Sequence, residues 1–381
     1  MGGWGTPTAV ANLITGFRRA CPNIQISVEY VTYNTGDAKV REAVENGDAP
    51  DLVFESPERL VASWGDRGLM TDLSELWAEE PSGEIYESIR RACRHSNGEY
   101  YIYPICASAY CMAINYDMFE AAGALQYLDE ENRTWTVEGF VHAVEALRAY
   151  GQERAGVVYC GGKSGDQGTR ALVNNLYGGV FTDEDHTRYE AAGEENIRAL
   201  QLLYDLDGIA FDSEMTGVEE VAQFCRGELA MAFCWNCSQE VMHTLKNPDL
   251  NFQVLPMTFP TNEQEPRLQG GIWGFGIFDN GDEEKIEAAK EFIRYVTTGD
   301  VYTRAVQMSN AWPVQKMENI YPNDTLMTEY RMFVPYVGDY YQVTPNWPAA
   351  RRAWWKTLQK IGNGEDIAEA LAAFDAEANA G

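Results

Sequence analysis

The sequence has 381 residues, of which 45% are hydrophobic and 12% aromatic, so it can bury two sizeable cores. Its 58 acidic and 29 basic residues give a net charge of −29, which argues against nucleic acid and an anionic membrane surface as partners. No stretch approaches the ~18 uninterrupted apolar residues of a membrane span.

The first part of the chain alternates helices with short apolar runs. Residues 6–20 place apolar side chains at helical spacing, 24–33 alternate as a strand does, and 37–46 form a further helix. Residues 52–54 are a short buried strand that ends in the polar run 55–59 (Glu-Ser-Pro-Glu-Arg). Because ligands bind at the carboxyl ends of strands in open α/β sheets, this polar run is a candidate binding segment.

The middle of the chain contains a long apolar strand and a glycine-rich loop. The strand lies within residues 101–119, between Tyr-Pro-Ile and Asn-Tyr-Asp. Thr136 caps a helix that runs to Leu147, and 156–160 is a strand followed by the loop 161–168. Gly-Lys-Ser in this loop is similar to part of a phosphate-binding loop, but the earlier glycine of that motif is out of register. A flexible ligand-facing loop at a helix N-terminus is the preferred interpretation.

The remaining segments continue the alternation of helices and strands. In chain order we expect helices at 194–207 and 218–224, strands at 229–233, 252–257 and 270–278, a helix with its apolar face at 288–296, and terminal helices after 345–348. A mixed α/β fold follows.

Several of these segments carry motifs of a known family. They are Pro-Asp with an apolar run and then Gly-Leu and Asp-Leu (50–73), Tyr-Pro-Ile with a strand and Asn-Tyr-Asp (103–117), Trp-Thr-x-x-x-Phe (135–140), and Gly-Glu-x-Ala-Met (227–231). In this order, the chain resembles the maltose-binding-protein-like solute-binding proteins of ABC importers over nearly its whole length.

This resemblance implies a two-lobed, type II periplasmic-binding-protein-like fold with discontinuous lobes. Lobe one would comprise residues 1–109 and 259–312, and lobe two residues 110–258 and 313–381. The lobes would close on a mono- or oligosaccharide by bending at crossover strands and deliver it to the membrane permease subunits of the importer. We expect no catalysis, no cofactor and no metal, and a monomer.

The resemblance also bears on location. Family members enter with an apolar strand just before the position of Trp4, so we expect a trimmed or late-starting chain that lacks a signal, a lipid anchor and most of the first strand. The full-length protein would then sit in the periplasm or, lipid-anchored, on the outer face of the cell membrane.

Carried over position by position, the resemblance implies a set of ligand-binding residues that combines aromatic rings with polar groups. These are Trp4, Glu55, Glu58, Arg59, Ser108, Asp166, Gln167, Trp235, Asn236, Trp273 and Trp354. Sugars need such a set, because their C–H faces stack on rings while their hydroxyls bind carboxylates, amides and Arg. Glu55 stands where maltose-binding relatives have Trp, so maltodextrin itself is not implied.

Other interpretations stay open at this point. Each tryptophan could pack in the core instead, and the Glu58–Arg59 pair could be a solvated helix start. Glu55 and Glu58 could serve a glycoside hydrolase as acid and nucleophile. The same fold could bind a polyamine, whereas a phosphorylated ligand is less favoured, with only Arg59 and Lys163 at hand.

The cysteines and histidines give weaker signals. Cys234-Trp-Asn-Cys237 could be a redox motif or half of a zinc site, but a second such pair is absent from the sequence. The four histidines lie far apart and form no metal-binding motif. Most of the eight cysteines stand in apolar surroundings, which favours buried thiols over disulfides.

Overall fold

The computed structural model describes residues 4–31, 36–79, 82–159, 161, 167–246, 250–317, 320–338 and 343–380. The chain forms two compact units. The first consists of Met1–Ser108 and Gly271–Asp324, and the second of Ala109–Gly270 and Thr325–Gly381. The strands are β1 (Leu52–Glu55), β2 (Tyr103–Asn115), β3 (Gly156–Tyr159), β4 (Ile209–Asp212), β5 (Met231–Trp235), β6 (Val254–Met257), β7 (Gln269–Ile277) and β8 (Trp312–Pro313).

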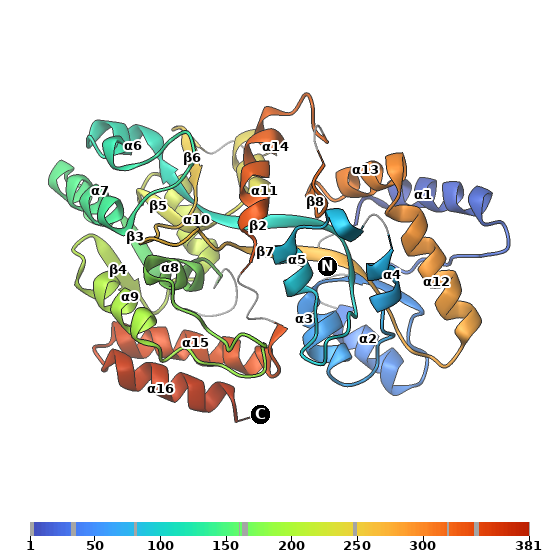
Figure 1. Ribbon diagram of the computed structural model, residues 1–381. Coiled ribbons are helices and arrows are strands. Elements are labelled where there is room, and N and C mark those ends of the chain that lie inside the picture. The colour runs from blue at the N-terminus through green and yellow to red at the C-terminus, as the bar shows by residue number, and fades with distance from the viewer. Residues whose placement is uncertain are drawn as a thin grey trace. The chain divides into compact units, whose positions relative to one another are not determined.

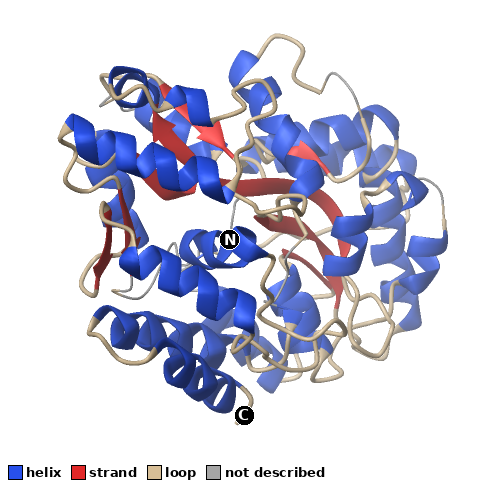
Figure 2. Cartoon of the chain, turned by 60° about the vertical axis from the view of Figure 1, so that its left-hand side comes forward, coloured by secondary structure: helices blue, strands red, loops and turns tan. Residues whose placement is uncertain are grey.

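Helices surround the strands in both units (Figures 1 and 2). In the first unit they are α1 (Pro7–Ala20), α2 (Gly36–Glu45), α3 (Pro57–Arg59) with a π-helical turn at Leu60–Gly65, α4 (Ser74–Ala78), α5 (Glu87–Ala92), α12 (Glu283–Val296) and α13 (Gly299–Met308). In the second unit they are α6 (Tyr116–Ala121), α7 (Val137–Tyr150), α8 (Gln167–Tyr177), α9 (Glu194–Asp205), α10 (Gly217–Cys225), α11 (Cys237–Val241), α14 (Thr325–Tyr330), α15 (Trp347–Gly362) and α16 (Ile367–Ala378).

The first unit is built on antiparallel strand pairs. β1 pairs with β7, and the first half of β2 pairs with the short β8. Gly274 on β7 lies so close to β2 that a Cβ atom there would stand 2.2 Å from the Tyr103 carbonyl oxygen, so a side chain at this position would push the strands apart. The apolar face of α1 covers this unit through Phe17, whose ring meets Phe292 of α12 edge-on at 5.2 Å.

The second unit contains two strand groups. The second half of β2 pairs with β5 and β6, and β3 and β4 form a separate parallel pair, which Figure 2 shows apart from the other strands. Helix α8 approaches β5 closely, because a Cβ atom on Gly168 would stand 2.1 Å from the Phe233 carbonyl oxygen. Helices α15 and α16 pack side by side (Figure 1).

Most of the elements expected from the sequence are present. Thr136 caps α7 by accepting a hydrogen bond of 3.0 Å from the Gly139 backbone N–H, as its spacing predicts. The expected strand at 24–33 is wrong for its described part, since residues 24–31 belong to neither a helix nor a strand. Val28 and Tyr30 there are 43% and 54% exposed, so the alternating apolar side chains find no sheet to join.

The chain passes from one unit to the other after residues 108, 270 and 324. Residues after β6 remain in the second unit, where Thr258 donates through its backbone N–H to the Arg133 carbonyl and Leu268 to that of Tyr336. The residues after β8 remain in the first unit, where the Val314 N–H donates to the Tyr302 hydroxyl at 3.1 Å. The lobe boundaries expected at 109, 258 and 312 stay predictions.

Candidate functional site

The polar run at the carboxyl end of β1 forms a compact cluster. β1 ends at Glu55, and Pro57 at the first helical position turns the chain into α3. The Glu55 carboxylate, only 3% exposed, accepts hydrogen bonds from the Ser56 N–H at 3.0 Å and the Ser56 hydroxyl at 3.1 Å. Arg59, one turn later, places a guanidinium nitrogen 3.6 Å from the same oxygen. The cluster therefore offers both acceptors and donors.

Glu58 stands beside this cluster on α3. Burial is the main cause that raises the pKa of its carboxyl, with a further increase from the charge of Glu55. Hydrogen bonds from Ser56 and the backbone, and the charge of Arg59, lower the same pKa. A half-buried carboxyl beside a second one suits hydroxyl ligands, and the same pairing occurs in glycoside hydrolases.

Trp4 belongs to an aromatic cluster of the first unit. Its half-exposed ring stacks on Phe54 with centroids 5.4 Å apart and meets Phe275 edge-on at 4.9 Å. Its indole nitrogen is buried and has no hydrogen-bond partner. Trp4 therefore packs against Phe54, the residue that precedes Glu55 on β1, and the stacking role expected for it stays a prediction.

The other sequence-derived positions in the first unit are strand residues. Ser108 is half-buried at the last residue of this unit on β2. Trp273 on β7 is also half-buried, and its ring folds over Gly271, where a Cβ atom would stand 1.9 Å from it.

Two expected site residues belong to the glycine-rich loop and the start of α8. Asp166 lies outside the described residues. Gln167 begins α8, but its side chain is not described.

Trp235 and Trp354 are core residues of the second unit. Trp235 is 0% exposed and donates its indole N–H to the Tyr330 hydroxyl at 2.6 Å. Trp354 is 1% exposed and meets Phe181 and Phe374 edge-on. Stacking on a sugar needs an exposed ring face, which neither residue presents, so packing accounts for both. Asn236 is half-buried and caps α11 by accepting from the Gln239 N–H at 3.0 Å.

The sequence interpretation missed a group of polar and aromatic residues in the second unit. Arg170 on α8 is 1% exposed and donates to the Gln269 amide oxygen at 3.2 Å. Its guanidinium lies 5.3 Å from the Trp347 ring centroid, and that of Arg351 lies 5.7 Å from it. An arginine in an amphipathic helix usually marks the solvated face, so the pattern gave no signal that Arg170 is buried.

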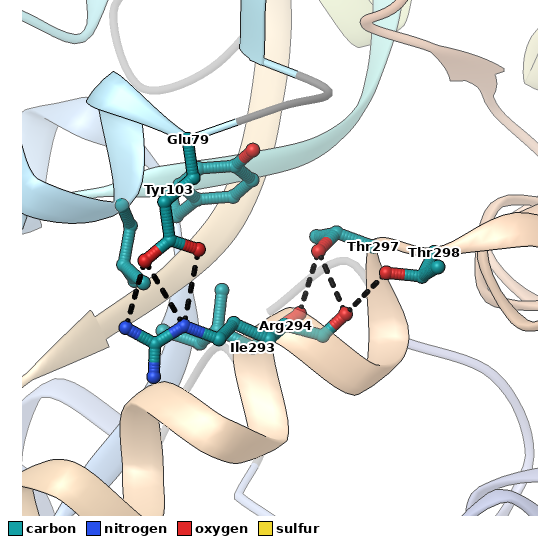
Figure 3. Close-up of a pocket in the computed structure, with 7 residues that line it drawn as sticks. Glu79, Tyr103, Ile293, Arg294, Thr297 and Thr298 are labelled. Atoms are coloured by element: carbon teal, nitrogen blue, oxygen red, sulfur yellow. Dashed lines mark hydrogen bonds and ion pairs between the residues drawn. The ribbon is translucent and has the colours of Figure 1, made fainter.

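A hollow of about 210 Å³ lies in the first unit between α4, α12 and β2. In Figure 3 the Glu79 carboxylate faces the Arg294 guanidinium, which donates to it through Nε at 3.1 Å and Nη2 at 2.8 Å. Glu291 accepts from Arg294 Nη1 at 2.7 Å, and hydrogen bonds from the guanidinium to Glu79 are the main cause that raises the Arg294 pKa. The Arg294 guanidinium is thus already paired with the carboxylates of Glu79 and Glu291, and this network joins α4 to α12.

The Cys-x-x-Cys segment runs from the end of β5 into the start of α11. Among the described residues, no group of three or more His, Cys, Asp or Glu side chains is placed to hold a metal ion. Within the Cys-x-x-Cys segment, the Cys237 sulfur lies 3.4 Å from that of Met327. The seven described cysteines are thiols rather than disulfides, and six of them are buried. Burial raises the pKa of Cys106 to about 12, which makes this thiol unreactive.

None of the helices in the described residues has the length and apolar character needed to cross a bilayer. Mixed α/β units that share the strands β2 and β7, with a polar cluster at a strand's carboxyl end, are typical of periplasmic binding proteins of type II. The chain belongs to the bacterial extracellular solute-binding protein family, whose model matches residues 3–301. The family and fold expected from the motifs are confirmed.

Solved structures with the same fold cover nearly the whole chain. An ABC substrate-binding protein from Listeria monocytogenes, in complex with cycloalternan, is 18% identical, with a TM-score of 0.69 over 98% of this chain and 96% of its own. A solute-binding protein from Thermotoga lettingae, bound to α-D-tagatose, is 19% identical, with a TM-score of 0.69 over 98% and 95%. The protein UgpB from Mycobacterium tuberculosis, in complex with glycerophosphocholine, is 19% identical, with a TM-score of 0.68 over 97% and 93%. Curated proteins give no match to this sequence.

Proposed function

We propose that this solute-binding protein captures a mono- or oligosaccharide for an ABC importer. The observation that carries the proposal is the cluster at the end of β1, where the buried Glu55 carboxylate is fixed by Ser56 and Arg59. Fixed carboxylates and guanidinium groups match the hydroxyl pattern of a sugar. Structural neighbours that hold cycloalternan and tagatose agree with this ligand class.

Further parts of the proposal follow from the family resemblance. The two units would close on the ligand by bending their shared strands, and the loaded protein would dock on membrane permease subunits as a monomer. The family is extracellular, and we propose that a lipid anchor in the full-length precursor holds the protein at the outer face of the membrane.

We also propose that the protein returns its ligand unchanged. The raised pKa of Glu58 beside Glu55 is the observation that favours the competing function, a glycoside hydrolase. A hydrolase would lose turnover with Glu58→Gln, whereas a binding protein would only bind its ligand more weakly.

A thermal-shift screen of the purified protein against sugars, glycans, polyamines and glycerol phosphates tests these proposals. A ligand at about 100 times its Kd stabilises the native state by roughly 2.7 kcal/mol, which raises the melting temperature visibly. We expect a shift with a sugar that chromatography then recovers intact. Shifts with polyamines alone would refute the proposal that the ligand is a sugar. Consumption of the glycan would refute the proposal that the protein only binds it.

A further inference from the structure

Strand β7 carries a glycine pair at the point where the chain passes from one unit to the other. Gly270 is the last residue of the second unit before this crossing, and Gly271 is the first residue of the first unit after it. β7 lies beside β2, which carries the crossing after Ser108, so two crossings run through neighbouring strands (Figure 1). Glycine has the widest choice of backbone angles, and a hinge consists of the few residues that absorb changes in those angles. The glycine pair is therefore the candidate hinge of β7.

The ring of Trp273 covers this hinge. Gly271 and Trp273 are two residues apart on the strand, so they face the same side of the sheet, and both are partly exposed there. A Cβ atom on Gly271 would stand 1.9 Å from the nearest carbon of the six-membered indole ring. The ring thus fills the space that any side chain at position 271 would need, and it lies directly on the backbone of the hinge.

The position of the ring limits how the hinge can move. A rotation about the Cα–C bond of Gly271 swings Trp273 relative to the glycine, so the ring leaves the place where it touches the backbone. Parts that fit this closely change between discrete arrangements rather than through a continuous range. Among the residues that the structure describes, none forms a hydrogen bond or an aromatic pair with the Trp273 indole, so no such bond has to break when the ring moves.

We propose that Trp273 is a clamp on the hinge of β7: its ring holds Gly271 in one backbone conformation and must slide off the glycine before the two units change their arrangement. This inference rests on the part of the proposed function in which the units close on the ligand. It gives Trp273 a role that acts through the backbone, distinct from the stacking on a sugar that the family resemblance implies. With the clamp the ligand-free protein holds one arrangement of its units, and without it the protein samples several.

Measurements on the ligand-free protein test the clamp. In Trp273→Ala we expect the backbone amides of residues 270–273 to exchange hydrogen about tenfold faster than in the wild type, which corresponds to about 1.4 kcal/mol less protection. We also expect a broader distribution of the radii of gyration that fit the small-angle X-ray scattering curve, because the hinge then samples more angles. Trp355→Ala, at a partly exposed position of α15, removes the same side chain away from β7 and is the matched control.

A double-mutant cycle links the effect to the contact between the ring and the glycine. Gly271→Ala places a Cβ atom where the ring lies, so it should expel the ring and broaden the same distribution. In the Trp273→Ala background the added methyl group meets no ring, so Gly271→Ala should have clearly less effect there than in the wild type. If Gly271→Ala does not fold, the comparison of Trp273→Ala with Trp355→Ala decides.

The outcomes separate this inference from sugar binding. Faster exchange in Trp273→Ala with an unchanged scattering curve would mean that the ring only covers the strand, and would overturn the clamp. Equal scattering curves for Trp273→Ala and Trp355→Ala would overturn it as well. Because these measurements contain no sugar, the clamp can fail while the thermal-shift screen still identifies a sugar. A screen without any sugar hit, together with a broadened distribution in Trp273→Ala, would overturn sugar binding and leave the clamp in place.

Discussion

The indole nitrogen of Trp235 lies 2.6 Å from the Tyr330 hydroxyl, and that hydroxyl donates in turn to the Glu240 carboxylate. Trp235 and Tyr330 are both buried, and Glu240 is 8% exposed. Tyr330 ends α14, the first helix after the chain enters the second unit for the last time. Because this one hydroxyl serves both a buried donor and a buried carboxylate, it fastens α14 to β5 and α11.

We therefore expect Tyr330→Phe to lower the free energy of unfolding by about 3 kcal/mol, since it leaves the indole N–H and the carboxylate without this partner. Urea denaturation measures the loss. Tyr150→Phe, at a position that is 58% exposed, is the control and should stay within about 0.5 kcal/mol of the wild type. Equal stabilities of the two variants would contradict the role given to the network.

Trp354 allows a test of packing against ligand contact. Its ring is buried against Phe181 and Phe374, and its indole nitrogen is buried without a hydrogen-bond partner. Trp354→Ala should cost about 3–5 kcal/mol, whereas Trp354→Phe, which also removes the unsatisfied N–H, should cost clearly less. Ligand affinity measured by calorimetry should be the same in Trp354→Phe and the wild type. A large loss of affinity would restore the stacking role.

Glu220 on α10 makes stability depend on pH. Its side chain is 0% exposed and accepts a hydrogen bond from the Phe233 N–H, and burial raises its pKa from 4.5 to about 8. Between these values the folded protein holds a proton that the unfolded chain releases, so the contribution of Glu220 to stability falls as pH rises.

Glu220→Gln should remove this dependence, because glutamine keeps an acceptor for Phe233 and does not titrate. We expect the stability of the variant relative to the wild type to rise by about 1.4 kcal/mol per pH unit within the window. Urea denaturation of both proteins at pH 5, 6, 7 and 8 measures this difference. A constant difference across the series would show that Glu220 has an ordinary pKa.

The ion-pair network between α4 and α12 should be sensitive to salt. Arg294 and Glu79 form a forked pair at the hollow seen in Figure 3, and both side chains are partly exposed. Arg294→Ala should cost about 1 kcal/mol at low ionic strength and less in concentrated salt. Arg304→Ala, at an exposed position on α13, provides the control. The same cost at all salt concentrations would assign the effect of Arg294 to packing of its aliphatic stem.

Local sequence patterns sufficed for elements whose cause is local. Thr136 caps α7 where its spacing predicts, and the apolar periodicity of α9 and α10 is matched by their buried faces. The strand prediction for 24–31 failed because an alternating pattern indicates only which face of a strand could be buried. Whether a neighbouring strand exists is a property of the tertiary structure.

The side chains of the candidate site were harder to predict for a related reason. Spacing relative to a family motif placed Trp235 near a strand end, but it could not show that Tyr330, 95 residues later, would enclose the ring. Arg170 and Gln269 are 99 residues apart and carry no local motif, so only the fold brings them together. The polar run 55–59 was recognisable because its residues are consecutive.

The different accessibilities of the cysteines allow one of them to be labelled selectively. Cys21, at the end of α1, is the half-exposed one among the seven described cysteines, and the other six are buried. In a Cys160→Ser background, a maleimide dye should therefore attach to Cys21 alone in the native protein. Paired with an acceptor dye on a second engineered cysteine in the other unit, this dye would report the proposed closure of the units on the ligand in real time.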